Sequence, residues 1–179
     1  MRNRIEHCCA NPLGACAYGD DMTGLDALDA RILLALDDDP EITTLALARR
    51  LGVARNTAHA RLRRLLDGGA LRSFSHRVAP AALGHGLTAF VSLAIAQHGS
   101  VAAMAELERI PQVLELHATT GDMDLLLKVV ARDTGHLYEL TERIVAIEGV
   151  TRSSTSIALR SPVPSRVAPL IREVFEQQG

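Results

Sequence analysis

Two short helical patterns joined by a three-residue step constrain the fold of this chain more than any other feature. Apolar residues recur every three or four positions over 45–51 and again over 58–66, as in helices that bury one side. Gly52 lies between the two patterns and permits a tight turn after the first helix. This arrangement predicts a helix-turn-helix whose second member, residues 55–67, protrudes from its domain.

The segments on either side complete this domain. Leu25, Leu28, Ile32 and Leu36 have helical spacing and precede an Asp-Asp-Asp-Pro run, so we expect an earlier helix that ends there. After Gly68-Gly69, residues 71–78 alternate in a way that favours a small β-hairpin wing. We therefore predict a winged helix-turn-helix domain over residues 24–82.

Charge is distributed unevenly along the chain, whose formal net charge is −2. Residues 49–77 hold eight arginines against one acid, a local net of +7, whereas residues 26–41 hold six acids and one arginine. A basic stripe of this kind suits a surface that binds phosphates. The alternative, a solvated charged helix face, stays open on charge alone.

The helix over residues 55–67 has the side chains that read DNA bases. With its apolar residues turned inward, Arg, Asn, Thr and His fall on its flank and outer side, where they can enter a major groove. Ala54 replaces the usual capping residue, so the start of this helix is expected to be uncapped. Arg61 lies near the core edge, where a structural role or a phosphate contact fits better than base reading. We assign DNA contacts to Thr44, Arg55, Asn56, Thr57, His59, Arg63 and Arg64.

Residues 86–160 read as a second domain with the order βαββαβ. This order is that of the ferredoxin-like unit, in which two helices cover one face of a four-stranded antiparallel sheet. The first strand carries apolar residues on both faces, so we expect another subunit to cover the open face. Residues 161–179 form a tail or a short helix. The expected strands are 87–97, 113–119, 124–131 and 151–160, and the expected helices cover 101–110 and 137–147.

Several function classes lack support in the sequence. The apolar runs fall far short of the roughly 18 residues of a membrane span, and no secretory signal is visible, so a cytoplasmic location is expected. Residues 1–23 lack periodicity and are expected to form a flexible tail. Cys8, Cys9 and Cys16 with His7 could suggest a metal site, but without a CxxC pair a thiol-bearing tail is preferred. His117 and His136 show no acid–base arrangement, so no catalytic residue, metal or cofactor is expected.

Taken together, the ordered motifs resemble the Lrp/AsnC (leucine-responsive/asparagine) family of transcription regulators. The resemblance begins with Leu-Asp-Ala-Leu-Asp-Ala-Arg-Ile-Leu at residues 25–33 and continues through Leu51-Gly52-Val53 and Gly69-Ala70-Leu71. It extends to Gly121-Asp122-Met123-Asp124 and Glu148-Gly149-Val150, and so covers about residues 25–160. Ala54 stands where the family usually has a serine cap, and Met123 where an aromatic residue is common.

This resemblance implies a DNA-binding regulator whose activity responds to a small effector, an amino acid or related metabolite. Members form homodimers or larger homo-oligomers through the α/β domain and bind effectors near the turn that holds Gly121, Asp122 and Asp124. A carboxylate there could pair with an ammonium group, and turn amides could hold a carboxylate; the two aspartates could equally serve only the β-turn. The alternative is an enzyme similar to the sirohaem decarboxylases, which share the architecture but would lack a basic recognition helix.

Overall fold

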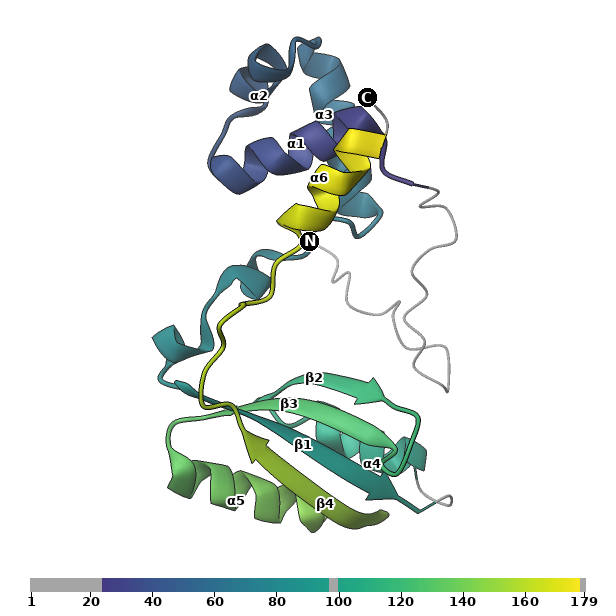
Figure 1. Ribbon diagram of the computed structural model, residues 1–179, viewed down its shortest axis with the longest axis vertical. Coiled ribbons are helices and arrows are strands. Elements are labelled where there is room, and N and C mark those ends of the chain that lie inside the picture. The colour runs from purple at the N-terminus through teal and green to yellow at the C-terminus, as the bar shows by residue number, and fades with distance from the viewer. Residues whose placement is uncertain (1–23, 97–99, 178–179) are drawn as a thin grey trace, which may run out of the picture. The chain divides into compact units, whose positions relative to one another are not determined.

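The computed structural model describes residues 24–96 and 100–177, which fall into two compact units (Figure 1). One unit combines the residues up to Phe74 with those from Val163 onwards, and the other is Ser75–Pro162. Each unit has its own cluster of buried apolar side chains. Among the described residues, no helix is long and apolar enough to cross a membrane.

The first unit, the helical unit, packs four helices around one small core. Ile32, Leu47 and Leu65 from three different helices are almost fully buried in it, and burial of each such side chain stabilises by about 1.5–3 kcal/mol. The core therefore ties the helix-turn-helix pair to the helix before it. The helices are α1 (Ala27–Asp38), α2 (Thr44–Leu51), α3 (Arg55–Asp67) and α6 (Ala168–Gln177).

Local chemistry fixes where the first helices begin and end. Asp26 caps α1 through a reciprocal capping box with Asp29, and Thr43 caps α2 by accepting a hydrogen bond from an amide of its first turn. Gly52 ends α2 with φ 70° and ψ 33°, a left-handed conformation that glycine adopts without a Cβ penalty. The expected uncapped start of α3 is confirmed, because Ala54 provides no side-chain hydrogen bond.

Helix α6 brings the end of the chain back onto the first helix. It lies beside α1 (Figure 1), and Ile171 joins the core of the helical unit. The sequence expectation for residues 161–179 was a tail or a short helix. The structure adds that the helical unit is built from both ends of the described chain.

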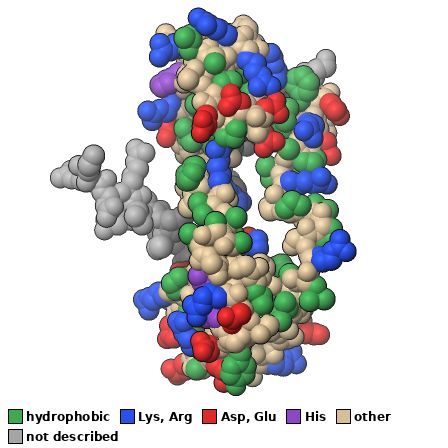
Figure 2. All heavy atoms as spheres, turned by 90° about the vertical axis from the view of Figure 1, so that its left-hand side faces the viewer, with side chains coloured by type: hydrophobic (Ala, Val, Ile, Leu, Met, Phe, Trp, Pro, Cys, Tyr) green, Lys and Arg blue, Asp and Glu red, His purple; other side chains and the backbone are tan. Residues whose placement is uncertain are grey.

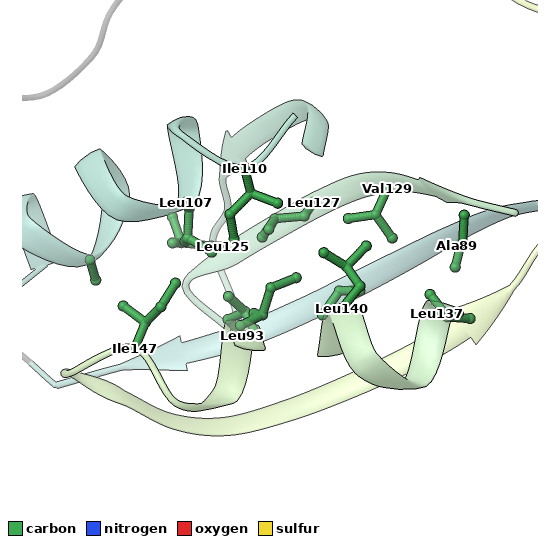
Figure 3. Close-up of a cluster of buried hydrophobic side chains, with 14 residues drawn as sticks. Ala89, Leu93, Leu107, Ile110, Leu125, Leu127, Val129, Leu137, Leu140 and Ile147 are labelled. Atoms are coloured by element: carbon green, nitrogen blue, oxygen red, sulfur yellow. The ribbon is translucent and has the colours of Figure 1, made fainter. Parts of the chain in front are cut away.

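The second unit, the sheet unit, is a four-stranded antiparallel sheet with order β2-β3-β1-β4. Helices α4 and α5 lie on one face (Figure 1), and apolar side chains from both helices, β1 and β3 meet between the helices and the sheet (Figure 3). The predicted ferredoxin-like βαββαβ architecture is therefore confirmed. The elements are β1 (Leu87–Ile95), α4 (Ser100–Glu108), β2 (Val113–Ala118), β3 (Leu125–Ala131), α5 (Thr134–Val145) and β4 (Val150–Ile157).

One local expectation is wrong. Residues 71–78 form no β-hairpin; instead Phe74–Arg77 is a 3₁₀ turn, followed by a second one at Pro80–Leu83. The alternating pattern of residues 71–78 is short, and Phe74, its largest apolar side chain, is exposed. A two-stranded ribbon here would therefore have no buried apolar face to stabilise it. The class of winged helix-turn-helix domain stands, but this segment supplies no hairpin.

The open face of the sheet mixes apolar and polar side chains. The core face of β1 carries Ala89, Val91 and Leu93, whereas its other face carries Phe90 next to Ser92. Phe90 pairs in register with Lys128, whose ammonium group lies 2.9 Å from a carboxylate oxygen of Glu115. Period-two alternation places Leu126 and Val130 of β3 on this same face. Apolar residues thus occur on both faces, as expected, but on the open face they alternate with polar ones.

Candidate nucleic-acid interface and effector turn

Helix α3 has one buried edge and a broad exposed surface. Only Ala58 and Leu65 are buried along it, Arg61 and Leu62 are half-buried, and the other side chains of the helix are exposed. Six of the seven residues assigned to DNA from the sequence lie on its exposed part: Arg55, Asn56, Thr57, His59, Arg63 and Arg64. The seventh, Thr44, is half-buried at the start of α2.

The outer side chains of α3 have hydrogen-bond donors that no other group of the described residues uses. Within the described part of the chain, the side chains of Arg55, Asn56, Thr57, His59 and Arg63 have no hydrogen-bond or ion-pair partner. Arginine can bind guanine with two hydrogen bonds, and asparagine can do so with adenine. Basic side chains are spread over the surface of the helical unit together with acidic ones (Figure 2). This surface can therefore offer both phosphate contacts and base contacts.

The turn before α3 is held by backbone and side-chain hydrogen bonds. The amide of Val53 donates to the carbonyl of Ala48 at 3.0 Å, and a guanidinium nitrogen of Arg31, on α1, donates to the carbonyl of Leu51 at 3.1 Å. The contact with Arg31 gives a partner to the Leu51 carbonyl, which lies in the last turn of α2 where carbonyls have no partner within the helix. These two hydrogen bonds tie the end of α2 to the turn before α3 and to α1.

Two arginines of α3 turn inward to acids at the start of α1. Arg61 forms ion pairs with Asp26 and Asp29, and Arg64 forms one with Asp29, whose side chain is 0% exposed. Arg61 thus has the structural role considered for it. One nitrogen of the Arg64 guanidinium is occupied in the same way, and its expected contact with DNA stays a prediction.

The same ion pairs shift two pKa values. Burial raises the pKa of the Asp26 carboxyl, but the backbone amide of Asp29 and the guanidinium of Arg61 outweigh burial and hold that pKa below its usual value. The hydrogen bond with Asp26 in turn raises the pKa of Arg61. Both groups are therefore charged near neutral pH.

The turn between β2 and β3 holds the residues assigned to the effector. Gly121 has φ 114°, which strains any residue with a Cβ. Asp124 is tied into the sheet, because one of its carboxylate oxygens accepts a hydrogen bond from the amide of Ile95 at 2.7 Å. Asp122 is exposed, and its carboxylate has no partner among the described residues. The two aspartates thus differ: one anchors the turn and the other is free to bind.

Sequence reasoning missed the residue that faces this turn from another strand. A guanidinium nitrogen of Arg152, on β4, donates to the carbonyl of Asp122 at 2.9 Å and lies 3.5 Å from the sulfur of Met123. Arg152 is thirty residues from the turn in sequence, so no local pattern could pair them. Only the strand order β3-β1-β4 could have indicated that β4 lies near the turn before β3.

A small hollow lies beside Asp124. It has a volume of about 270 Å³ and is lined by residues of β1, α4 and β3: Ile95, Ala96, Ser100, Met104, Asp124 and Leu125. Its apolar walls and single carboxylate match a small molecule with one polar end. A larger hollow of about 570 Å³, at the ends of α4 and α5, contains none of the residues assigned to the effector.

The remaining expectations from the sequence concern the N-terminal tail with its cysteines and a possible metal site. The cysteine-containing segment and His7 lie outside the described residues, as does the whole of the expected tail. In the part of the chain that the structure describes, no group of three or more His, Cys, Asp or Glu could hold a metal ion.

Comparison with known proteins gives two family matches along the chain. Residues 25–72 match the winged helix-turn-helix DNA-binding model, and residues 88–168 match the Lrp/AsnC ligand binding domain. The HTH-type transcriptional regulator AldR of Mycolicibacterium smegmatis is 39% identical over 137 residues, which are 74% of this chain and 80% of AldR. The Bkd operon transcriptional regulator of Pseudomonas aeruginosa is 32% identical over 154 residues, 83% of this chain and 100% of that protein.

Solved structures agree with these matches. Escherichia coli AsnC superposes with a TM-score of 0.73 at 28% identity, covering 82% of this chain and 99% of AsnC. A Neisseria meningitidis transcriptional regulator, solved as a complex with L-Met, gives a TM-score of 0.71 at 25% identity with the same coverage of both chains. Both the helical pattern and the sheet architecture are thus found together in single relatives.

Proposed function

Because the chain belongs to the Lrp/AsnC family of DNA-binding transcription regulators with a ligand-binding domain, we propose that an amino acid or a related small metabolite controls its binding to specific operators. The observation that carries the DNA part is the outer surface of α3. Arg55, Asn56 and Thr57 occupy its exposed first turn without protein partners, which is where recognition helices contact base edges. Arg63 extends the same surface with a charge suited to phosphate.

The test of sequence reading begins with DNA fragments that the purified protein selects from genomic DNA. Affinity for a selected duplex is then compared with affinity for a random duplex of equal length. Arg55→Ala and Asn56→Ala should each lose about 1–3 kcal/mol on the selected duplex and much less on the random one, because each removes one bidentate base contact. The matched control is Arg143→Ala, which removes an exposed arginine from α5.

Equal weakening on both duplexes would mean that Arg55 and Asn56 touch only phosphates. If wild type binds neither duplex more tightly than the other, sequence-specific regulation is refuted for this chain.

The effector proposal rests on three polar groups and an apolar hollow. The free carboxylate of Asp122 can accept from an ammonium group, and Arg152, beside it, has further guanidinium nitrogens for a carboxylate. The left-handed turn at Gly121 brings backbone amides to the same place, and Asp124 borders the hollow. Both charges of an α-amino acid thus find an opposite charge, with space for a small side chain. The L-Met complex of the Neisseria regulator supports this ligand class.

Thermal unfolding in the presence of each amino acid tests this site. A ligand at about a hundred times its Kd stabilises the folded protein by about 2.7 kcal/mol, so at least one amino acid should raise Tm. Asp122→Asn should remove most of that rise, whereas Glu139→Gln, an exposed acid on α5, should keep it. If no amino acid changes Tm at millimolar concentration, the ligand class is wrong, while DNA binding stands on its own test.

We place the dimer interface on the open face of the sheet. Phe90 is 40% exposed there, and exposed aromatic side chains are enriched at interfaces between subunits. Phe90→Glu would place a charge in the centre of such an interface and should lower the mass seen by sedimentation. A wild-type monomer at micromolar concentration would contradict a homo-oligomer.

A regulatory rather than an enzymatic role fits the same residues. The sirohaem-decarboxylase alternative would lack a basic recognition helix, and Arg55, Arg63 and Arg64 are present on α3. No observation favours a catalytic site over the effector turn. Since the partner is chromosomal DNA, the site of action is the compartment that holds it, the cytoplasm.

A further inference from the structure

A buried carboxylate links the first helix to the helix that faces DNA. The side chain of Asp29, in the first turn of α1, is 0% exposed. Among the residues that the structure describes, Asp29 is the one charged residue that is buried. Its oxygens accept from the amide of Asp26 at 3.2 Å and from the guanidinium groups of Arg61 and Arg64. A carboxylate without water depends on such partners, because burial of an unpaired charge is strongly unfavourable.

The two arginines come from the same side of α3. They are three residues apart, one turn of helix, so both can reach one carboxylate only over a narrow range of helix rotations. The apolar anchors of α3 are few for a helix of 13 residues: Ala58 contributes a single methyl group, Leu65 is the one large side chain fully buried along it, and Leu62 is partly buried against the same core. The start of α3 has no side-chain cap either. The ion pairs with Asp29 therefore restrain the rotation of α3 in addition to its few apolar contacts.

We infer that Asp29 is a positioning residue for DNA recognition, which sets the rotation of α3 and thereby the aim of Arg55 and Asn56 at the bases. It acts through Arg61 and Arg64 and does not itself touch DNA. Base contacts require a defined direction of approach, whereas phosphate contacts by flexible arginines tolerate rotation of the helix. Loss of the Asp29 charge should thus reduce sequence preference more than it reduces overall DNA affinity.

A purely structural role predicts a different result. If Asp29 only stabilises the fold, Asp29→Asn lowers the free energy of unfolding but leaves the DNA preference of the folded fraction unchanged. Arg61 and Arg64 are 30% and 54% exposed, so water can solvate both cations after the carboxylate is gone. The variant should therefore fold, and the two roles can be separated.

The experiment compares full-length wild type, Asp29→Asn and Asp38→Asn on a selected and a random duplex. Asp38→Asn is the matched control: it also removes an aspartate of α1 that pairs with an arginine, but its partner Arg50 lies on α2. For Asp29→Asn we expect the ratio of selected to random affinity to fall by about tenfold or more, the size of one misdirected bidentate contact. Affinity for the random duplex should change by less than about threefold, since phosphate contacts dominate it. Asp38→Asn should keep the wild-type ratio.

The outcomes separate this inference from the DNA-binding function on which it rests. A wild type without preference refutes the proposed function itself. A folded Asp29→Asn that keeps the wild-type ratio overturns only the positioning role. If Asp29→Asn does not fold, Asp26→Asn replaces it in the experiment. Asp26 is 44% exposed, so its replacement disturbs the fold less, and it pairs with Arg61, one of the two arginines that Asp29 binds. In that case a lowered ratio supports positioning through the arginines, and an unchanged ratio overturns it.

Discussion

Replacement of Gly52 tests whether the turn between α2 and α3 holds the helical unit together. A Cβ built at Gly52 would meet no atom within 4 Å, so alanine adds no clash and the cost is that of its left-handed backbone alone. That cost is about 1–2 kcal/mol for a residue with a Cβ. Asparagine adopts this conformation more readily, so Gly52→Asn should cost clearly less than Gly52→Ala.

Hydrogen exchange followed by mass spectrometry measures this cost in each unit separately. The most protected amides of α2 and α3 should exchange about 5- to 30-fold faster in Gly52→Ala, the factor that corresponds to this loss of free energy. Amides of the sheet unit serve as an internal control and should keep their rates. Gly86→Ala, where φ is not positive and the Cβ also meets nothing within 4 Å, should slow or preserve exchange. Equal protection in wild type and Gly52→Ala would refute the argument that this turn requires a left-handed residue.

Three further results are expected. Arg63→Gln should make the slope of log affinity against log salt less steep by about 0.9, the value of one phosphate contact, and an unchanged slope would mean that Arg63 does not touch phosphate. Because the pKa of Asp26 is lowered from 3.8 in the folded protein, its stabilising effect is present above the unfolded pKa. It is lost as pH falls through the folded-state pKa, so wild type and Asp26→Asn should differ in urea denaturation above about pH 4 and converge progressively at lower pH. Leu140→Ala, 1% exposed in the sheet unit, should lose about 2–5 kcal/mol, whereas Leu159→Ala, 90% exposed, should lose almost nothing.

Periodicity predicted most of the fold because each element had a complete local signal. The helices of the turn motif carried apolar residues at helical spacing, and the four strands alternated or followed a glycine turn. The missing cap at Ala54 was also visible, since capping depends on the residue immediately before the helix.

Contacts between distant segments could not be predicted in this way. The two ion pairs of Asp29 join residues more than thirty positions apart, and Arg152 reaches the turn between β2 and β3 across the sheet. Helix α6 has an amphipathic pattern, but nothing in it indicates that α1 is its partner. The prediction of a β-hairpin over residues 71–78 was wrong for a different reason. The local alternation is present in the sequence, but no second surface buries its apolar face.

Fluorescence anisotropy on one labelled duplex, selected by the protein from genomic DNA, tests effector-controlled DNA binding most directly. We expect tight, salt-dependent binding that exceeds binding to a random duplex. An amino acid that raises Tm should also shift the affinity for the selected duplex by about 5- to 150-fold, the usual range of coupling between two sites. Affinity that is the same for both duplexes, or that no stabilising amino acid changes, would contradict effector-controlled binding to specific DNA.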